Sequence, residues 1–404
     1  MSRSHGKNMK ALLSCALAVF LVSAFNGTAS AQYKPNIHVG ALEIHPYACV
    51  EQTYDSNIYL EPRNRENADN ITDIRVGTAV KLPIIPEREE DFLIEGSYHA
   101  DIIEFWKYKH RDRVDHHARG LLDCTFANDF RLRIRERFEK TADPPDSERT
   151  TLDKRYRNVV NPTLSYTREK ITLEGGYEMT RDAYDENRLN NLNRTDHVFT
   201  GTCFYQVLPK TSVLAEYNLG LIRYDNHRTN SDSVENQARI GVIGKLWPKL
   251  TGTLKLGYRY VSYNESDKTD YSNFTMFANL KYDMTERTIV NLFADRTSQE
   301  SSYASNSYYE MNKVALNVDH LLAERLRLDG GGFIGYNRYP VTTIEGDDIG
   351  KRKDFLWGAN AGLKYDIKEW LFVDVGYKFK QRTSRFSVYD YNDHKISAQL
   401  CAKF

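Results

Sequence analysis

The sequence has little of what a disulfide scaffold, a nucleic-acid-binding protein or a helical membrane protein requires. Only five of its 404 residues are cysteine, and no two of them form a CxxC pair. The 55 basic residues are balanced by 55 acidic ones, so there is no basic surplus to bind nucleic acid. After residue 32 no uncharged run exceeds about a dozen residues, whereas a spanning helix needs about 20. We therefore expect no transmembrane helix.

Recognisable catalytic and cofactor motifs are also missing. The sequence contains no HExxH, GxSxG or GxxxxGK[ST]. The stretch GGGFIG (330–335) fits GxGxxG, but it lies inside a strand-like segment with no helix after it. His116 and His117 are adjacent in an alternating segment and so face opposite sides. We expect no enzyme, no cofactor and no metal site.

The first 31 residues have the features of a cleavable export signal. Arg3, Lys7 and Lys10 precede a short apolar run from Ala11 to Phe25, and Ala29-x-Ala31 offers a cleavage site before Gln32. A lipoprotein signal at Cys15 fits poorly, because most of the apolar run follows the cysteine. We predict a signal peptide at 1–31, a short periplasmic segment at 32–45 and one β-domain at 46–404.

Alternating apolar and polar residues recur about every 20 residues along the rest of the chain. Examples are FLIEGSYHADI (92–102) and TGTLKLGYRYVSY (251–263). This period indicates strands with one apolar and one polar face. Eighteen candidate strands start near residues 46, 74, 91, 113, 130, 154, 170, 194, 211, 234, 250, 271, 287, 309, 325, 354, 370 and 389. Sixteen strands is the second choice.

The connections between these strands alternate between tight turns and long polar loops. The predicted turns are 128–129, 168–169, 208–210, 247–249, 285–286, 323–324 and 368–369. The predicted loops are 56–70, 141–153, 185–193, 224–233, 297–307 and 339–354. This asymmetry and the strand lengths favour an all-β, antiparallel transmembrane β-barrel of the bacterial outer membrane over a soluble sandwich or propeller. Pro162 falls within a strand, where we expect a β-bulge.

The last strand ends the chain on an aromatic residue. The apolar face of this strand consists of Ile396, Ala398, Leu400, Ala402 and Phe404. In a barrel this face contacts outer-membrane lipid. The pattern resembles the C-terminal signal that the barrel-assembly machinery reads in Gram-negative outer-membrane proteins. The same parity places an interfacial aromatic belt outside, formed by Tyr258, Tyr260, Tyr282, Tyr336, Tyr365, Tyr377 and Phe379.

Arginines dominate one part of the predicted lumen wall. Parity turns the following side chains inward on neighbouring strands: Arg113, Arg119, Arg131, Arg133, Arg135, Arg137, Arg155 and Arg157. Acidic residues are interleaved with them, at Glu95, Asp101, Asp115, Asp123, Glu174, Glu178 and Asp182. Two interpretations remain open. The charges neutralise each other in a polar interior, or the arginines form a basic strip that attracts carboxylates or phosphates.

Four cysteines remain after the signal. Cys49 and Cys401 face the lumen in the first and last strands, and the sequence leaves open whether they are bonded. Cys124 and Cys203 fall on the outward face beside tight turns and are expected to be small apolar fillers.

One stretch carries a family resemblance. YACVEQTYDSNIY (47–59) resembles the opening of a β-barrel porin family linked to exopolysaccharide secretion, with Tyr54, Asp55, Asn57 and Ile58 at the motif positions. Ser56 stands where that family often has Asp. Similarity continues through 93–120 and 205–225 and covers most of the mature chain. The resemblance implies a passive outer-membrane channel for polysaccharide export, working with periplasmic export proteins. A general or sugar-uptake porin and a structural or adhesive barrel plugged by its loops are the alternatives.

Overall fold

The computed structural model describes residues 37–85, 91–126, 129–226, 230–265, 268–302 and 306–404. The predicted signal peptide (1–31) and residues 32–36 lie outside this part. Nineteen strands and three short 3-10 helices are formed within it. No helix in these ranges has the length and apolar character needed to cross a membrane.

The long strands follow one another around a single sheet. They are β2 Leu42–Asp55, β3 Asp69–Pro83, β4 Phe92–Phe105, β5 Arg113–Thr125, β6 Phe130–Thr141, β7 Arg155–Arg168, β8 Ile171–Tyr184, β9 Arg194–Leu208, β10 Thr211–Tyr224, β11 Ser233–Trp247, β12 Leu250–Tyr263, β13 Tyr271–Asp283, β14 Thr288–Glu300, β15 Tyr308–Ala323, β16 Leu326–Glu345, β17 Asp348–Lys368, β18 Leu371–Ser384 and β19 Tyr391–Lys403. The 3-10 helices are η2 Lys109–Arg111, η3 Asn187–Leu192 and η4 Ser387–Tyr389.

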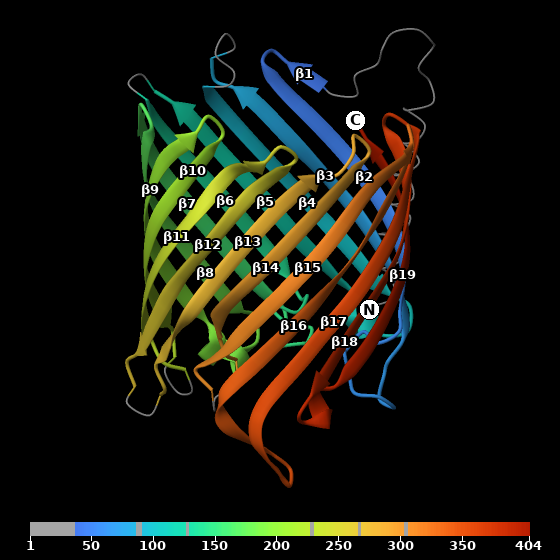
Figure 1. Cartoon of the computed structure of the whole chain (residues 1–404). Helices are drawn as coiled ribbons and strands as arrows, with labels where there is room; N and C mark the ends of the chain where they lie inside the picture. Colours follow the sequence, from blue (N-terminus) through green and yellow to red (C-terminus); the bar gives the residue numbers. More distant parts are fainter. Residues whose placement is uncertain (1–36, 86–90, 127–128, 227–229, 266–267, 303–305) are drawn as a thin grey trace. The chain divides into compact units, whose positions relative to one another are not determined.

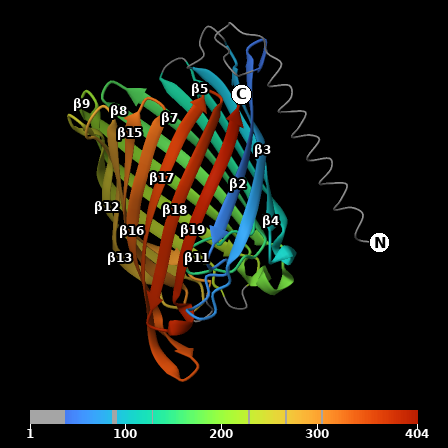
Figure 2. The ribbon, with the colours of Figure 1, turned by 90° about the vertical axis from the view of Figure 1, so that its right-hand side faces the viewer.

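The sheet closes on itself. Each long strand pairs antiparallel with the one before it, and β19 pairs antiparallel with β2 from Tyr47↔Lys403 to Asp55↔Lys395. Figures 1 and 2 show the tilted strands on both sides of the resulting barrel. The prediction of an eighteen-stranded antiparallel barrel is confirmed, and the sixteen-stranded alternative is wrong. All but three of the predicted strand starts lie within two residues of the observed ones.

The segment expected to precede the barrel is partly built into the sheet. β1 (Ile37–Val39) forms a hairpin with the start of β2, in which Val39 lies opposite Leu42. Gly40 makes this tight turn with a φ of +63°, a conformation that suits glycine. The first long strand therefore begins at Leu42, four residues earlier than position 46.

The strand faces follow the sequence alternation. In β17, Phe355, Trp357 and Leu363 are exposed on the outer face, while Arg352 and Asp354 are buried on the inner one. Exposed leucines, isoleucines, valines and aromatics occur on the outer face of most strands, including Tyr258, Tyr282 and Tyr365 of the predicted aromatic belt. Water would disfavour so large an apolar surface, and hydrocarbon would not. The packed polar side chains lie inside the barrel.

The two ends of the barrel differ. At the turn end, β7–β8, β9–β10, β11–β12, β15–β16 and β17–β18 are joined by two residues each. Apart from the two-residue β16–β17 connection, the connections at the opposite end, here the loop end, are longer than these turns and have six to thirteen residues. The predicted loop 339–354 is mostly wrong, because β16 and β17 continue through it as a hairpin and pair down to Glu345↔Asp348. Backbone pairing continues there beyond the apolar band.

The bulge expected at Pro162 is absent. The pairs Val160↔Met179 and Thr163↔Gly176 keep one register on both sides of the proline, so no extra residue is inserted. The ladder instead lacks two pairs at this point. The side chain of Asn161 compensates by donating from Nδ2 to the carbonyl oxygen of Tyr177 at 3.2 Å. A neighbouring amide thus replaces a hydrogen bond that proline cannot donate.

Candidate functional site: the lumen and its seam

A disulfide joins the strands that close the barrel. Cys49 of β2 and Cys401 of β19 are directly opposite each other, with a Cα–Cα distance of 4.1 Å, and they are bonded. Both side chains are buried on the lumen side. This settles the alternative that the sequence left open.

The residues of the family motif tie the seam at the loop end. Asp55 Oδ2 forms an ion pair with Lys395 Nζ of β19 at 2.7 Å. Asn57 is fully buried, and its Nδ2 donates to the carbonyl oxygens of Glu61 and Asn392 at 2.8 and 2.9 Å. Ile58, the next residue along the chain, is also buried, whereas the side chain of Tyr54 is exposed on the outer face. The motif therefore folds the first loop onto the last strand.

The other two cysteines are free. Cys203 is exposed on the outer face, as predicted, whereas Cys124 is buried. Cys124 lies opposite Phe92 in the sheet, and Phe92 stacks edge-on against Phe126, so aromatic rings gather at this end of β5. Strand parity turns the side chain of Cys124 outward, and the neighbouring aromatic rings account for its burial.

The eight predicted arginines lie on neighbouring strands, but they are not equivalent. Six of them have carboxylate partners. Arg131 and Arg133 share Asp123, at 2.6 and 2.9 Å, and Arg155 and Arg157 share Asp182, at 3.6 and 3.0 Å. Arg113 contacts Asp115 at 3.0 Å and Asp143 at 2.6 Å, and Arg137 contacts Glu139 at 3.6 Å. For these six, the interpretation as mutual neutralisation describes the geometry.

Arg119 and Arg135 differ from the rest. Within the described part of the chain neither forms an ion pair, and both are exposed. They line a hollow of about 780 Å³ on the lumen wall together with Arg137, Glu95 and Glu178. A guanidinium group presents five donors in a planar fork that matches a carboxylate or a phosphate. These two side chains can therefore offer hydrogen bonds to an anionic solute.

The connection between β6 and β7 reaches across the loop end of the lumen. We call residues 142–154 the lid. Ser147 accepts a hydrogen bond from Asn337 Nδ2 of β16 at 2.9 Å, and its carbonyl oxygen accepts one from Arg382 Nη1 of β18 at 2.7 Å. In an eighteen-stranded barrel β16 lies opposite β7. The sequence predicted only a long polar loop here, and nothing local distinguishes it from the others.

A buried glutamate anchors the lid. Glu148 is 1% exposed, and its carboxyl group accepts hydrogen bonds from Ser301 Oγ at 2.6 Å, Ser302 N at 2.6 Å and Ser302 Oγ at 2.9 Å. Burial, reinforced by the charge of Asp146, raises the pKa of Glu148 to about 7. The lid therefore holds a carboxyl group that titrates near neutral pH.

Aromatic rings occupy the wall facing the arginines. Phe277, Phe293 and Phe333 are half-buried and point inward from β13, β14 and β16. The rings of Phe277 and Phe293 meet edge-on with centroids 5.9 Å apart, and Lys313 Nζ lies 5.4 Å from the centre of the Phe333 ring. The lumen thus has a guanidinium-rich wall and an aromatic wall on opposite sides.

A closed antiparallel barrel with an apolar exterior and a polar interior defines a porin-like channel of the outer membrane. The family model "Putative beta-barrel porin 2" matches residues 34–404, and the chain belongs to this family. In this setting the turn end faces the periplasm and the loop end the exterior.

Several solved outer-membrane proteins are similar to the chain. The outer membrane protein OpdK from Pseudomonas aeruginosa is 10% identical, with 89% of this chain and 99% of that chain covered and a TM-score of 0.47. OpdL from the same organism is 12% identical, with 90% and 98% covered and a TM-score of 0.45. The FrpB iron transporter from Neisseria meningitidis is 11% identical at a TM-score of 0.44; 84% of this chain and only 62% of that chain are covered. No curated protein sequence matches.

Proposed function

We propose that the protein is an outer-membrane channel through which an anionic polysaccharide leaves the cell. The observation that carries the proposal is the pair of unlike walls in the lumen. Arg119 and Arg135 have no ion-pair partner among the described residues and are available to carboxylates. The inward-pointing rings of Phe277 and Phe293 on the other side suit the apolar C–H face of a sugar ring.

The lid supports a gated rather than a permanently open conduit. Its contacts to β16, to β18 and to the β14–β15 connection are hydrogen bonds that other partners can replace. A polymer that arrives from the periplasm would displace the lid outward.

Two sets of partners follow from this assignment. The outward face of β19 offers Ile396, Ala398 and Leu400 to the barrel-assembly machinery, while Phe404 stacks on Trp370 with centroids 5.6 Å apart. Periplasmic export proteins of the same secretion route would deliver the polymer at the turn end. The signal peptide predicted at 1–31 would bring the chain to both.

A barrel plugged by its own loops is the second candidate, because the lid spans the lumen. Planar-bilayer recordings distinguish the two. A channel conducts at least intermittently, whereas a plugged structural or adhesive barrel shows no unitary current.

Polymer probes test the proposed cargo. Oligogalacturonate and dextran of equal length are added to conducting channels on the periplasmic side. We expect half-block by the uronate at a concentration at least about tenfold lower, which is ~1.4 kcal/mol. The R119Q/R135Q double variant should remove this preference, while R131Q should retain it because Arg131 is already paired. Equal block by both polymers in the wild type would refute an anionic cargo.

A further inference from the structure

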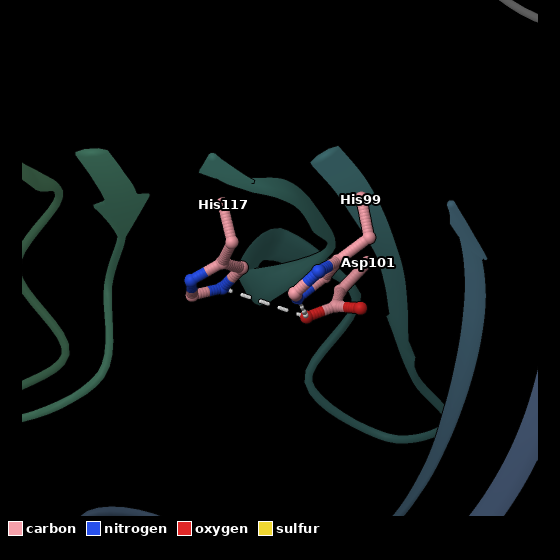
Figure 3. Close-up of side chains that lie close together, drawn as sticks. All are labelled: His99, Asp101 and His117. Atoms are coloured by element: carbon pink, nitrogen blue, oxygen red, sulfur yellow. Dashed lines mark ion pairs between the residues drawn. The ribbon is translucent and has the colours of Figure 1, made fainter. Parts of the chain in front are cut away.

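Two histidines and an aspartate converge on the lumen wall away from the lid. His99 and Asp101 are two residues apart on β4 and so share its inner face, and His117 lies opposite His99 on β5. One ligand atom from each residue, a ring nitrogen or a carboxylate oxygen, lies within 4.8 Å of the other two. Figure 3 shows both imidazole rings beside the carboxyl group.

The three groups approach one another without bonding directly. His99 Nε2 and His117 Nε2 lie 3.8 and 3.5 Å from Asp101 Oδ2, longer than an ordinary hydrogen bond. The two rings stack with centroids 4.7 Å apart and an interplanar angle of 20°. Metal–ligand bonds of about 2.0–2.2 Å place tetrahedral ligands about 3.4 Å apart. The Nε2–Oδ2 distances are close to this spacing, and the two stacked rings must tilt so that their Nε2 lone pairs converge on the ion.

Neighbouring side chains orient these groups from behind. Arg75 Nε donates to Asp101 Oδ1 at 2.6 Å and Arg75 Nη2 donates to Oδ2 at 3.3 Å, so the guanidinium fixes the carboxyl group with Oδ2 nearest the two histidines. Tyr47 Oη lies 3.1 Å from His99 Nδ1. When Nδ1–H donates to Tyr47, Nε2 presents its lone pair to the cluster, and such second contacts are typical of metal-binding histidines. Asp101 is buried, so its orientation is restricted.

We propose that His99, Asp101 and His117 form a binding site for a first-row divalent cation, with Zn²⁺ and Cu²⁺ as the best candidates. Two imidazoles and one carboxylate suit these ions, and the lumen leaves further coordination positions to water or solute. Asp73 and Asp115 flank the site and face Arg75 and Arg113, so the local charges nearly balance before the cation binds. A bound ion would add positive charge beside Arg119. The site does not depend on which polymer the channel carries.

The sequence alone does not reveal this site, because His117 lies on β5 whereas His99 and Asp101 lie on β4. Strand parity separates His117 only from its neighbour His116, which faces the other side of the sheet. Its stacking partner on the same side, His99, lies 18 positions earlier in the chain and becomes a neighbour only through the β4–β5 register.

Metal titration of the full-length protein, folded in detergent micelles and purified without a histidine tag, tests the site. We expect one Zn²⁺ to bind per chain, and Cu²⁺ to give an electron paramagnetic resonance spectrum with nitrogen couplings from two imidazoles. H99Q and H117Q should each weaken Zn²⁺ binding at least about tenfold. H116Q is the matched control, since it removes an adjacent histidine from the outer face and should bind as the wild type does. Mg²⁺ should not compete.

The proposal fails if the wild type binds no Zn²⁺, or if H117Q and H116Q bind it equally. Heat-modifiable migration in gels shows whether each variant is folded, and Y47F offers a milder second test. Y47F keeps all three ligands and should weaken Zn²⁺ binding by less than H99Q does. Loss of the two-nitrogen signal in H116Q but not in H99Q would place the ion elsewhere and overturn the assignment.

Discussion

Removing the carboxyl group of Glu148 should open the lid. At pH 5.5 this carboxyl group is protonated, because burial raises its pKa to about 7. Three hydrogen bonds then hold it to Ser301 and Ser302. At about 1 kcal/mol for each neutral bond, E148A removes about 3 kcal/mol from the closed state, which shifts the equilibrium between closed and open lid about 150-fold. The open probability should rise accordingly.

The same glutamate predicts how the wild type responds to pH. With the lid open, Glu148 is solvated and returns to its ordinary pKa of 4.5. The closed state has the higher pKa and binds the proton more tightly, so its stabilisation is complete below 4.5 and is lost as the pH rises through about 7. The open probability should therefore increase between pH 4.5 and 7. E148A should lack this dependence.

Single-channel recording in planar bilayers measures both effects. E66A is the matched control, because Glu66 is an exposed glutamate in the loop 56–68 whose carboxyl group accepts a hydrogen bond from Asn64 N of the same loop. Wild type and E66A should show the same pH profile. If E148A leaves the open probability at pH 5.5 within a factor of two of wild type, the lid is not held by these hydrogen bonds and the reasoning is wrong.

Three further predictions concern the wall and the seam. R135Q should shift the reversal potential in a salt gradient away from anion selectivity more than R131Q does, since Asp123 already neutralises Arg131; equal shifts would contradict the distinction. C49S/C401S should lower the free energy of unfolding by about 6 kcal/mol, because the bond closes a loop of 352 residues; unchanged urea midpoints by tryptophan fluorescence would argue against it. N57A should cost about 2–3 kcal/mol, since it removes the two hydrogen bonds that the buried Asn57 Nδ2 donates to the carbonyl groups of Glu61 and Asn392, and R63A in the exposed part of the same loop serves as the control.

Much of the fold was predictable because strand faces obey a short-range rule. The alternation along 211–224 and 391–403 places β10 and β19 and assigns their faces without any tertiary information. The hairpin at 339–354 was missed because its polar residues resemble a loop, and pairing outside hydrocarbon leaves no apolar signature.

The site was predictable only in part, for a related reason. Strand parity places the side chains of Arg119 and Arg131 on the same side of the sheet. Only Arg131 has its charge neutralised by Asp123, and this depends on a diagonal contact between neighbouring strands. The lid depends on Asn337 and Arg382, which lie 190 and 235 residues from Ser147. No local pattern in 142–154 distinguishes a loop that folds inward from one that extends into solvent.

The disulfide between Cys49 and Cys401 makes the closure of the barrel covalent. Where only hydrogen bonds join the first and last strands, these strands can separate laterally and open a path from the lumen into the bilayer. Here a covalent bond crosses the seam, so β2 and β19 cannot separate at Cys49 and Cys401. The disulfide can also form only after β19 has paired with β2, so its presence indicates that the barrel has closed.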